Sequence, residues 1–122
     1  KKRLFEVTYM FNFSADYIQR NREAVFSAAA RYALLDMESL LELLDCFNRL
    51  NITGQLKSIQ APTLVMVGEE DIPKPRKYSE IIAGEIPRAE LVVVPRAGHA
   101  LCLEKPLVFN ALILGFLRQL QG

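Results

Sequence analysis

The chain has 122 residues, of which 51% are hydrophobic and 24% are charged, a composition that fits one globular domain and argues against disorder. Its formal net charge is +1, and acidic and basic residues are interspersed without a basic stripe, so we expect no nucleic-acid partner. No apolar run approaches the roughly 20 residues that a membrane-spanning helix needs, so we expect no membrane partner either.

The two cysteines, Cys46 and Cys102, lie in apolar stretches and show no CxxC or Cys/His ligand spacing. We expect both to be reduced, buried thiols, which is typical of a cytoplasmic protein. A zinc site needs more ligands than two distant cysteines and a single histidine supply, so we expect no metal site.

The pattern is helical before residue 60. Residues 13–35 begin with Ser14 or Asp16 as a candidate N-cap and then place apolar residues on roughly one face of a helix. Residues 36–51 begin with Asp36 as a second candidate cap, and their apolar side carries Leu40, Leu41, Leu44, Phe47 and Leu50. The aromatic-rich segment ahead of both has no clean period, so strand, helix and a covering surface all stay open for it.

After residue 60 the pattern becomes strand, helix, strand, helix. Residues 62–68 and 90–95 are continuous apolar runs of strand length, which is typical of strands buried on both faces. Residues 74–87 predict a helix with Pro75 in its first turn, and residues 105–120 predict a closing amphipathic helix. Two buried strands joined by a helix indicate a parallel βαβ unit with a right-handed crossover.

The only histidine, His99, lies in the loop after the second predicted strand, and Asp71 lies in the loop after the first. Ligands gather outside the carboxyl ends of parallel strands, and neighbouring strands lie about 4.8 Å apart. We therefore expect Asp71 to reach one ring nitrogen of His99 and to leave the other for proton transfer. Glu69, Glu70 and Glu104 compete as partners, and a loop histidine that only hydrogen-bonds a backbone carbonyl is the structural alternative.

Two stretches of the sequence, residues 59–75 and 86–117, resemble the C-terminal part of an α/β-hydrolase. The family pattern runs through Ile-x-x-Pro before a strand, a Gly-x-x-Asp turn, a helix ending in Ile-Pro, a second strand with Gly-His, and Glu-x-Pro at the last helix. The matching residues are Ile59 with Pro62, Gly68 with Asp71, Ile86 with Pro87, Gly98 with His99, and Glu104 with Pro106. The match covers about half the chain, and the ordered set is far more specific than any single motif.

The resemblance implies an α/β fold class, namely a partial α/β-hydrolase fold with cap-like helices over residues 1–58 and a parallel β-α-β-α unit over residues 59–122. It implies that Asp71 is the acid of a catalytic triad and that His99 is the general base. It also implies that neither a metal nor an organic cofactor takes part.

The chain departs from the family pattern at the nucleophile, which in this family lies on a G-x-S-x-G elbow, or on a variant with Asp or Cys, before the acid and the histidine. None of its serines lies in such a glycine frame, and no HG-type oxyanion loop is present; the serines are Ser14, Ser27, Ser39, Ser58 and Ser79. We therefore expect the elbow upstream of Lys1, in a longer enzyme. Alone, the chain should not turn over substrate, because its base has no nucleophile to activate.

A second departure concerns the sheet, which has about eight strands in the full fold and only two predicted strands here. The strand within residues 63–67 then keeps an open apolar edge, which is a template for pairing. We expect a homodimer that continues the sheet across a two-fold axis, with the aromatic N-terminal segment covering exposed faces.

The leading functional hypothesis is a hydrolase of ester-type bonds, which binds a small apolar substrate such as an ester, lactone or thioester. Haloperoxidase-like, dehalogenase-like and C–C bond hydrolase members share the same C-terminal pattern. Tyr9, Phe11 and Phe13 either line an acyl pocket or belong to the core. The alternatives are a non-catalytic receptor or interaction scaffold and a self-contained dimerising domain; the intact pair of Asp71 and His99 favours the enzyme.

Overall fold

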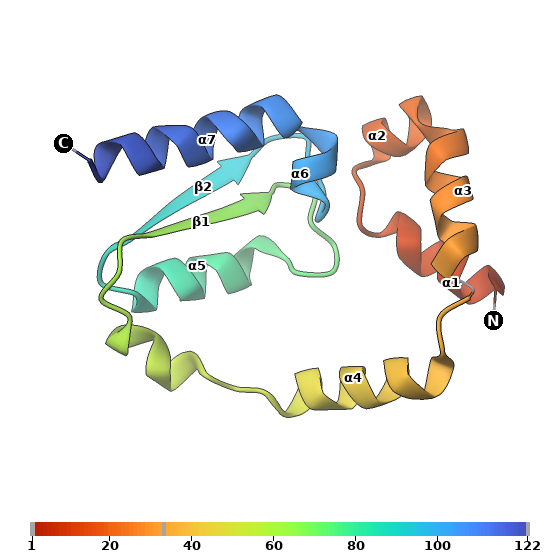
Figure 1. Cartoon of the computed structure of the whole chain (residues 1–122), viewed down its shortest axis with the longest axis horizontal. Coiled ribbons are helices and arrows are strands. Elements are labelled where there is room, and N and C mark those ends of the chain that lie inside the picture. Colours follow the sequence, from red (N-terminus) through yellow and green to blue (C-terminus); the bar gives the residue numbers. More distant parts are fainter. Residues whose placement is uncertain (1, 33, 122) are drawn as a thin grey trace.

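The computed structural model describes residues 2–32 and 34–121. Its N-terminal part is helical, with α1 (Lys2–Met10), α2 (Ala15–Arg20), α3 (Arg22–Tyr32) and α4 (Met37–Arg49). A 3₁₀-helix then leads into a β-α-β-α-α succession: η1 (Thr53–Ser58), β1 (Thr63–Gly68), α5 (Arg76–Glu85), β2 (Ala89–Val94), α6 (Leu101–Glu104) and α7 (Pro106–Gln119) (Figure 1). None of the helices in these described residues is both long enough and apolar enough to span a membrane.

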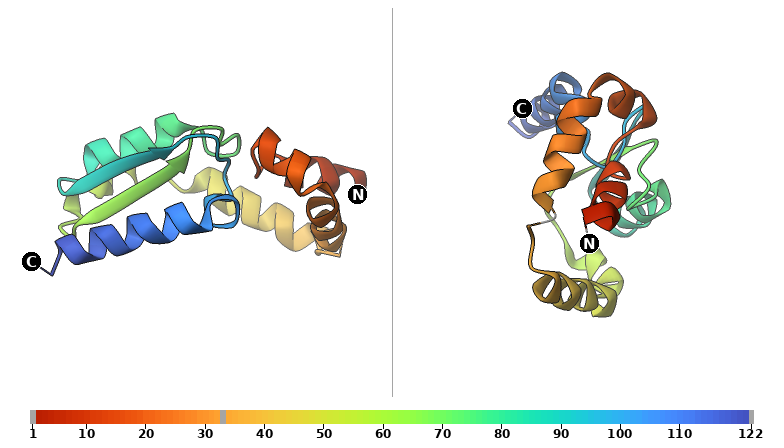
Figure 2. Two further views of the ribbon diagram at one scale, coloured as in Figure 1. Left: turned by 90° about the horizontal axis from the view of Figure 1, so that it is seen from above. Right: turned by 90° about the vertical axis from the view of Figure 1, so that its right-hand side faces the viewer.

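The sheet consists of β1 and β2, which pair in parallel and in register from Thr63 opposite Ala89 to Gly68 opposite Val94. Figures 1 and 2 show α5 on one face of this sheet and α7 on the other. On the α7 side a buried cluster joins β2, its following loop, α6 and α7, and it contains Val94, Ala97 and Leu101 with Met66, Val92, Phe109 and Leu112 packed against them. The predicted parallel βαβ unit is confirmed.

The two strands are nevertheless less buried than their composition predicts. Val67 and Val94 are buried, but most other residues of β1 and β2 are only half-buried. Within the described residues each strand pairs with only one other strand, so the sheet has two open edges. Side chains near these edges have fewer neighbours than those of a strand in the middle of a larger sheet. The prediction that both strands are buried on both faces is therefore wrong for this chain by itself.

The predicted helix over residues 13–35 is two helices, α2 and α3, separated at Asn21. The Asn21 side-chain amide donates to the Tyr17 carbonyl oxygen at 3.0 Å, and the Asn21 backbone leaves the helical region. Asparagine breaks helices in this way because its short amide competes for backbone partners. The predicted caps are confirmed, since Ser14 accepts a hydrogen bond from the Tyr17 amide and Asp36 accepts one from the Ser39 amide.

The aromatic N-terminal segment, for which the sequence leaves three possibilities, forms helix α1 and a short turn. α1 packs mainly against α3. Phe13 is buried between the ring of Tyr17, stacked at a centroid distance of 5.1 Å, and the edge of the Tyr9 ring at 5.2 Å. The aromatic residues therefore hold the N-terminal helices together, and the expectation that they cover the exposed sheet is not met.

Helix α4 buries none of its residues, and its predicted apolar side is exposed at Leu41, Leu44 and Phe47. Cys46 lies on this helix and is an exposed free thiol. Cys102 is also free and exposed, because the single turn of α6 directs Leu101 and Glu104 inward and leaves the residues between them outside. The prediction of buried cysteines is therefore wrong, although both are unpaired as expected.

Two glycines allow the chain segments to meet at the carboxyl ends of the strands. A Cβ on Gly68 would lie 2.3 Å from the carbonyl oxygens of Ala97 and Gly98. A Cβ on Gly98 would lie 2.7 Å from a Glu104 carboxylate oxygen and from backbone atoms of Phe13 and Ser14. Glycine fits at both positions because all of these contacts except the one with Glu104 are with backbone, which cannot move aside independently.

We expect Gly68→Ala and Gly98→Ala to lower the free energy of unfolding by about 1–3 kcal/mol each, because each forces neighbouring backbone apart. Gly84→Ala is the matched control: it lies in α5 with nothing within 4 Å of the added Cβ, and it should stabilise the helix by about 0.5–1 kcal/mol. Urea denaturation of the three variants measures these differences. Equal effects at the three positions would contradict the close packing described.

We also expect the isolated chain to self-associate through the open edge of β1. The Thr63 amide donates to Arg88, just before β2, and the Glu69 amide, just after β1, donates to Val94. Alternate residues face opposite edges, so Leu64 and Met66 direct their backbone groups to the open edge. Leu64→Pro removes an edge donor without touching the pairing with β2 and should shift the mass in light scattering toward the monomer. Leu64→Ala keeps the backbone donor and should leave the mass unchanged. An equal shift of the mass in both variants would exclude pairing at this edge.

Candidate active site

The candidate site lies where β1 and β2 end at the same level of the sheet. Because Gly68 is opposite Val94 in the register, the loops that follow the two strands leave from the same edge. The loops are joined by backbone hydrogen bonds, from the Glu69 amide to the Val94 carbonyl and from the Glu70 amide to the Ala97 carbonyl, each 2.9 Å long. The strand pairing is thereby continued into the loops, which brings their side chains together.

Asp71 and His99 are in direct contact in these loops, as the strand pattern predicts. The Nδ1 atom of His99 lies 2.9 Å from Oδ2 of Asp71. The second carboxylate oxygen, Oδ1, accepts a hydrogen bond from the Lys74 amide at 2.8 Å. A carboxylate can only accept here, so the contact requires the tautomer in which His99 carries a proton on Nδ1 and its lone pair on Nε2.

The two partners differ in their exposure. The Asp71 side chain is 6% exposed, whereas the His99 side chain is 42% exposed. The carboxylate is therefore anchored inside the loop cluster, while the imidazole extends from it toward the surface. Within the described residues Asp71 is the only hydrogen-bond partner of the His99 ring, so Nε2 is available to a further group.

The three glutamates that compete with Asp71 on sequence spacing have other roles. Glu69 accepts a hydrogen bond from the Arg96 amide at 3.3 Å, and Glu70 is exposed. Glu104 is buried and binds the Gly98 amide and Ser14 rather than the imidazole. The structure thus brings Asp71 and not its competitors to His99.

The Glu104 contact with Ser14 is absent from the sequence-based expectations, which consider Ser14 only as a helix cap and Glu104 only as a competing acid or part of a motif. These two residues are 90 positions apart, and no local pattern relates them. The one signal available in the sequence is that Glu104 is an acidic residue in the otherwise apolar stretch around Leu101 and Leu103.

Within the described residues no serine or cysteine side chain is hydrogen-bonded to His99. Ser14 is buried against Glu104, and the other serines lie on α3, α4, η1 and α5. The exposed thiol of Cys102, three residues from His99, is not hydrogen-bonded to the ring either. In the part of the chain that the structure describes, the oriented imidazole therefore has no serine or cysteine bonded to it.

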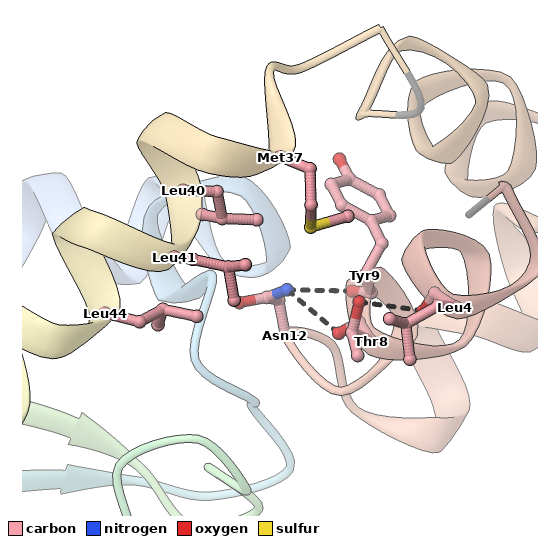
Figure 3. A pocket seen from close by; sticks show the side chains of 8 residues that line it. All are labelled: Leu4, Thr8, Tyr9, Asn12, Met37, Leu40, Leu41 and Leu44. Atoms are coloured by element: carbon pink, nitrogen blue, oxygen red, sulfur yellow. Dashed lines mark hydrogen bonds between the residues drawn. The ribbon is translucent and has the colours of Figure 1, made fainter.

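An apolar groove lies beside this loop cluster, between α1 and α4 (Figure 3). Its volume is about 390 Å³, and it is lined by Leu4, Thr8, Tyr9, Asn12, Met37, Leu40, Leu41 and Leu44. The Asn12 amide group donates to the Tyr9 carbonyl oxygen at 2.9 Å, and the Thr8 hydroxyl donates to the Leu4 carbonyl oxygen at 3.0 Å. Of the three aromatic residues considered for a pocket, Tyr9 lines this groove, whereas Phe13 is buried in the core and Phe11 is exposed.

The groove and the histidine loop are connected through one residue. The Asn12 carbonyl oxygen accepts a 2.7 Å hydrogen bond from the amide of Ala100, the residue that follows His99. Asn12 thus lines the groove with its side chain and binds the histidine loop with its backbone. A ligand in the groove would lie next to the segment that carries the imidazole.

Comparison with known proteins gives relatives that are enzymes. No family model matches the chain. A putative carbamate hydrolase, RutD, of Pseudomonas syringae is 30% identical over 110 residues, which are 88% of this chain and 42% of that protein. A solved structure of Est816, an N-acyl homoserine lactone degrading enzyme, matches with a TM-score of 0.77 and 31% identity, over 94% of this chain and 47% of the other.

A further solved structure, MGS-M2, is an α/β-hydrolase enzyme from a deep-sea metagenome library of the Medee basin. It matches with a TM-score of 0.71 and 24% identity over 88% of this chain and 41% of the other, which shows a shared fold. The chain spans less than half the length of each of these three proteins. Its elements are those of the C-terminal part of the α/β-hydrolase fold, and the chain belongs to the α/β-hydrolase family.

Proposed function

We propose that the chain supplies the general base, His99, and the orienting acid, Asp71, of an α/β-hydrolase that cleaves ester-type bonds. The 2.9 Å contact between His99 Nδ1 and the buried Asp71 carboxylate, at the carboxyl ends of two parallel strands, is the observation that carries this proposal. In this proposal the nucleophile that His99 activates lies on a segment before Lys1 in a longer protein. The proposal of a longer protein is supported by the length of the enzyme relatives, of which the chain spans 42–47%.

In this proposal Asp71 holds the proton on Nδ1, so the lone pair of Nε2 points away from the acid and can take a proton. The nucleophile loses its proton to Nε2 as it attacks the substrate carbonyl, and the imidazolium is stabilised by the Asp71 charge. His99 then gives the proton to the leaving group and repeats the cycle with water. Asp71 is suited to this role because it is fixed by the Lys74 amide.

The apolar groove between α1 and α4 supports the proposal that the substrate is small and apolar. The Thr8 hydroxyl and the Asn12 NH₂ group donate to carbonyls of α1, and most of the other residues that line the groove are leucines and Met37. Two relatives are named for a carbamate and an N-acyl homoserine lactone, both of which contain an acyl carbon bonded to a heteroatom. We propose a substrate of this chemistry, bound partly by the helical residues 1–58 as a cap over the core part, residues 59–122.

We also propose a cytoplasmic location, supported by the two free thiols at Cys46 and Cys102. The open edge of β1 supports a homodimer for the chain by itself. Neither point is needed for the chemistry of the site.

The test is hydrolysis of nitrophenyl esters and of acyl lactones by the protein encoded by the complete reading frame. We expect Asp71→Asn to lower kcat by roughly 10⁴-fold, because it allows the wrong imidazole tautomer. We expect His99→Gln to lower kcat by roughly 10⁶-fold, because it removes the base. Glu70→Gln is the matched control, since Glu70 lies on the same loop and is exposed. It should leave kcat unchanged.

Residues 1–122 by themselves should show no His99-dependent turnover, because this proposal assigns the nucleophile and the oxyanion donors to another segment of a longer protein. A complete protein that binds acyl compounds but does not cleave them would instead identify a receptor of the same fold. Full activity in His99→Gln would remove this residue from the mechanism.

A further inference from the structure

The buried carboxylate of Glu104 lies at the junction between the N-terminal helices and the histidine loop. Its side chain accepts three hydrogen bonds: Oε1 accepts from the Gly98 amide at 2.9 Å and from the Ser14 amide at 3.1 Å, and Oε2 accepts from the Ser14 hydroxyl at 2.5 Å. Glu104 is 9% exposed and Ser14 is 2% exposed. Burying a carboxylate is costly unless donors replace its water, and here three donors do so.

These contacts fix the backbone on both sides of His99. On one side, the Gly98 amide is bound to Glu104. On the other, the Ala100 amide is bound to the carbonyl oxygen of Asn12, at 2.7 Å. The imidazole therefore belongs to a backbone segment held at two points by residues 12–14 and Glu104.

The junction is closely packed as well as hydrogen-bonded. A Cβ on Gly98 would meet Oε1 of Glu104 and the backbone of Phe13 and Ser14, each at 2.7 Å. Ser14 also caps α2, since its hydroxyl oxygen accepts a hydrogen bond from the Tyr17 amide at 3.3 Å while its O–H donates a hydrogen bond to Glu104. Displacement of the N-terminal helices would therefore release Glu104 and Gly98 together.

We propose that Glu104 is a positioning residue for His99, and that the segment between α1 and α2 must be bound to Glu104 for the imidazole to face Asp71. Glu104 hydrogen-bonds neither the imidazole nor Asp71, so it acts through the Gly98 backbone. The catalytic consequence rests on the proposed function of His99, whereas the structural coupling does not. In the complete enzyme the docking of the helical cap and the placement of the base are then one event.

Three variants separate this role from a general contribution to stability. Glu104→Ala removes all three hydrogen bonds. Glu104→Gln can keep its oxygen at the Oε1 position, where it accepts from both backbone amides, and turn its NH₂ group toward the Ser14 hydroxyl oxygen. Ser14→Ala removes the hydroxyl hydrogen bond and retains the one from the residue 14 amide to Glu104. Glu85→Gln is the matched control, because Glu85 is exposed at the end of α5.

In the complete protein we expect Glu104→Ala to lower kcat per folded enzyme by roughly 10²-fold with little change in KM, since a misplaced base slows chemistry rather than binding. Glu104→Gln should restore most of the rate, and Ser14→Ala should fall between them. A loss confined to stability would leave kcat per folded enzyme unchanged in all three variants, and would overturn the proposal.

A second readout does not depend on activity. Amide hydrogen exchange, measured by NMR on the same proteins, should accelerate at both Gly98 and Ala100 in Glu104→Ala, and the downfield Nδ1 proton of His99 should be lost. Acceleration at Gly98 alone, with the His99 signal intact, would contradict the coupling. If the wild-type protein hydrolyses nothing, the proposed function fails, and the exchange pattern still decides the role of Glu104. If Glu104→Ala does not fold, the same comparison is made between Ser14→Ala and Glu104→Gln.

Discussion

The parallel, in-register pairing of β1 with β2 is the constraint on which the rest of this structure depends. It ends both strands at one level, Gly68 opposite Val94, so that the two following loops start side by side. The loops then bind each other through backbone hydrogen bonds that continue the ladder, and Gly68 permits the approach because it has no side chain. The distance between Asp71 and His99 is a consequence of this geometry, since neighbouring strands are separated by less than 5 Å.

The site built on this edge is asymmetric. Asp71 is buried and bound by the Lys74 amide, whereas His99 is partly exposed and bound by Asp71. A fixed carboxylate beside a reachable imidazole suits a base that accepts a proton from a group brought to it. The backbone beside His99 is in turn held at Gly98 by Glu104 and at Ala100 by Asn12 of the N-terminal segment. Orientation of one imidazole thus involves three separate segments.

The exposure of apolar groups on this chain agrees with the proposal that it is part of a longer enzyme. β1 has an open edge, α4 buries no residue, and large apolar side chains such as Leu107 and Leu34 are more than four-fifths exposed. The enzyme relatives are more than twice as long as the matched region, and a larger fold supplies neighbours for such surfaces. The proposal of a longer hydrolase therefore accounts both for the uncovered apolar surface and for the described residues' lack of a serine or cysteine bonded to His99.

The sequence by itself determined the features that depend on local chemistry. Continuous apolar runs predicted the two strands, Pro106 marked the start of α7, and Ser14 and Asp36 were recognised as caps, because each signal acts within a few residues. The order of strand, helix and strand was enough to predict that Asp71 and His99 lie at one edge.

Only the tertiary structure decided what depends on contacts between distant residues. Asp71 was selected from four acidic candidates because the loop conformation turned Glu104 toward Gly98 and Glu69 toward Arg96. The exposure of Cys46 and of the strands followed from the few neighbours that pack on α4 and on a two-stranded sheet. The bond between Ser14 and Glu104 joins residues 90 positions apart, and a pairing at that separation leaves no period or spacing in a single sequence.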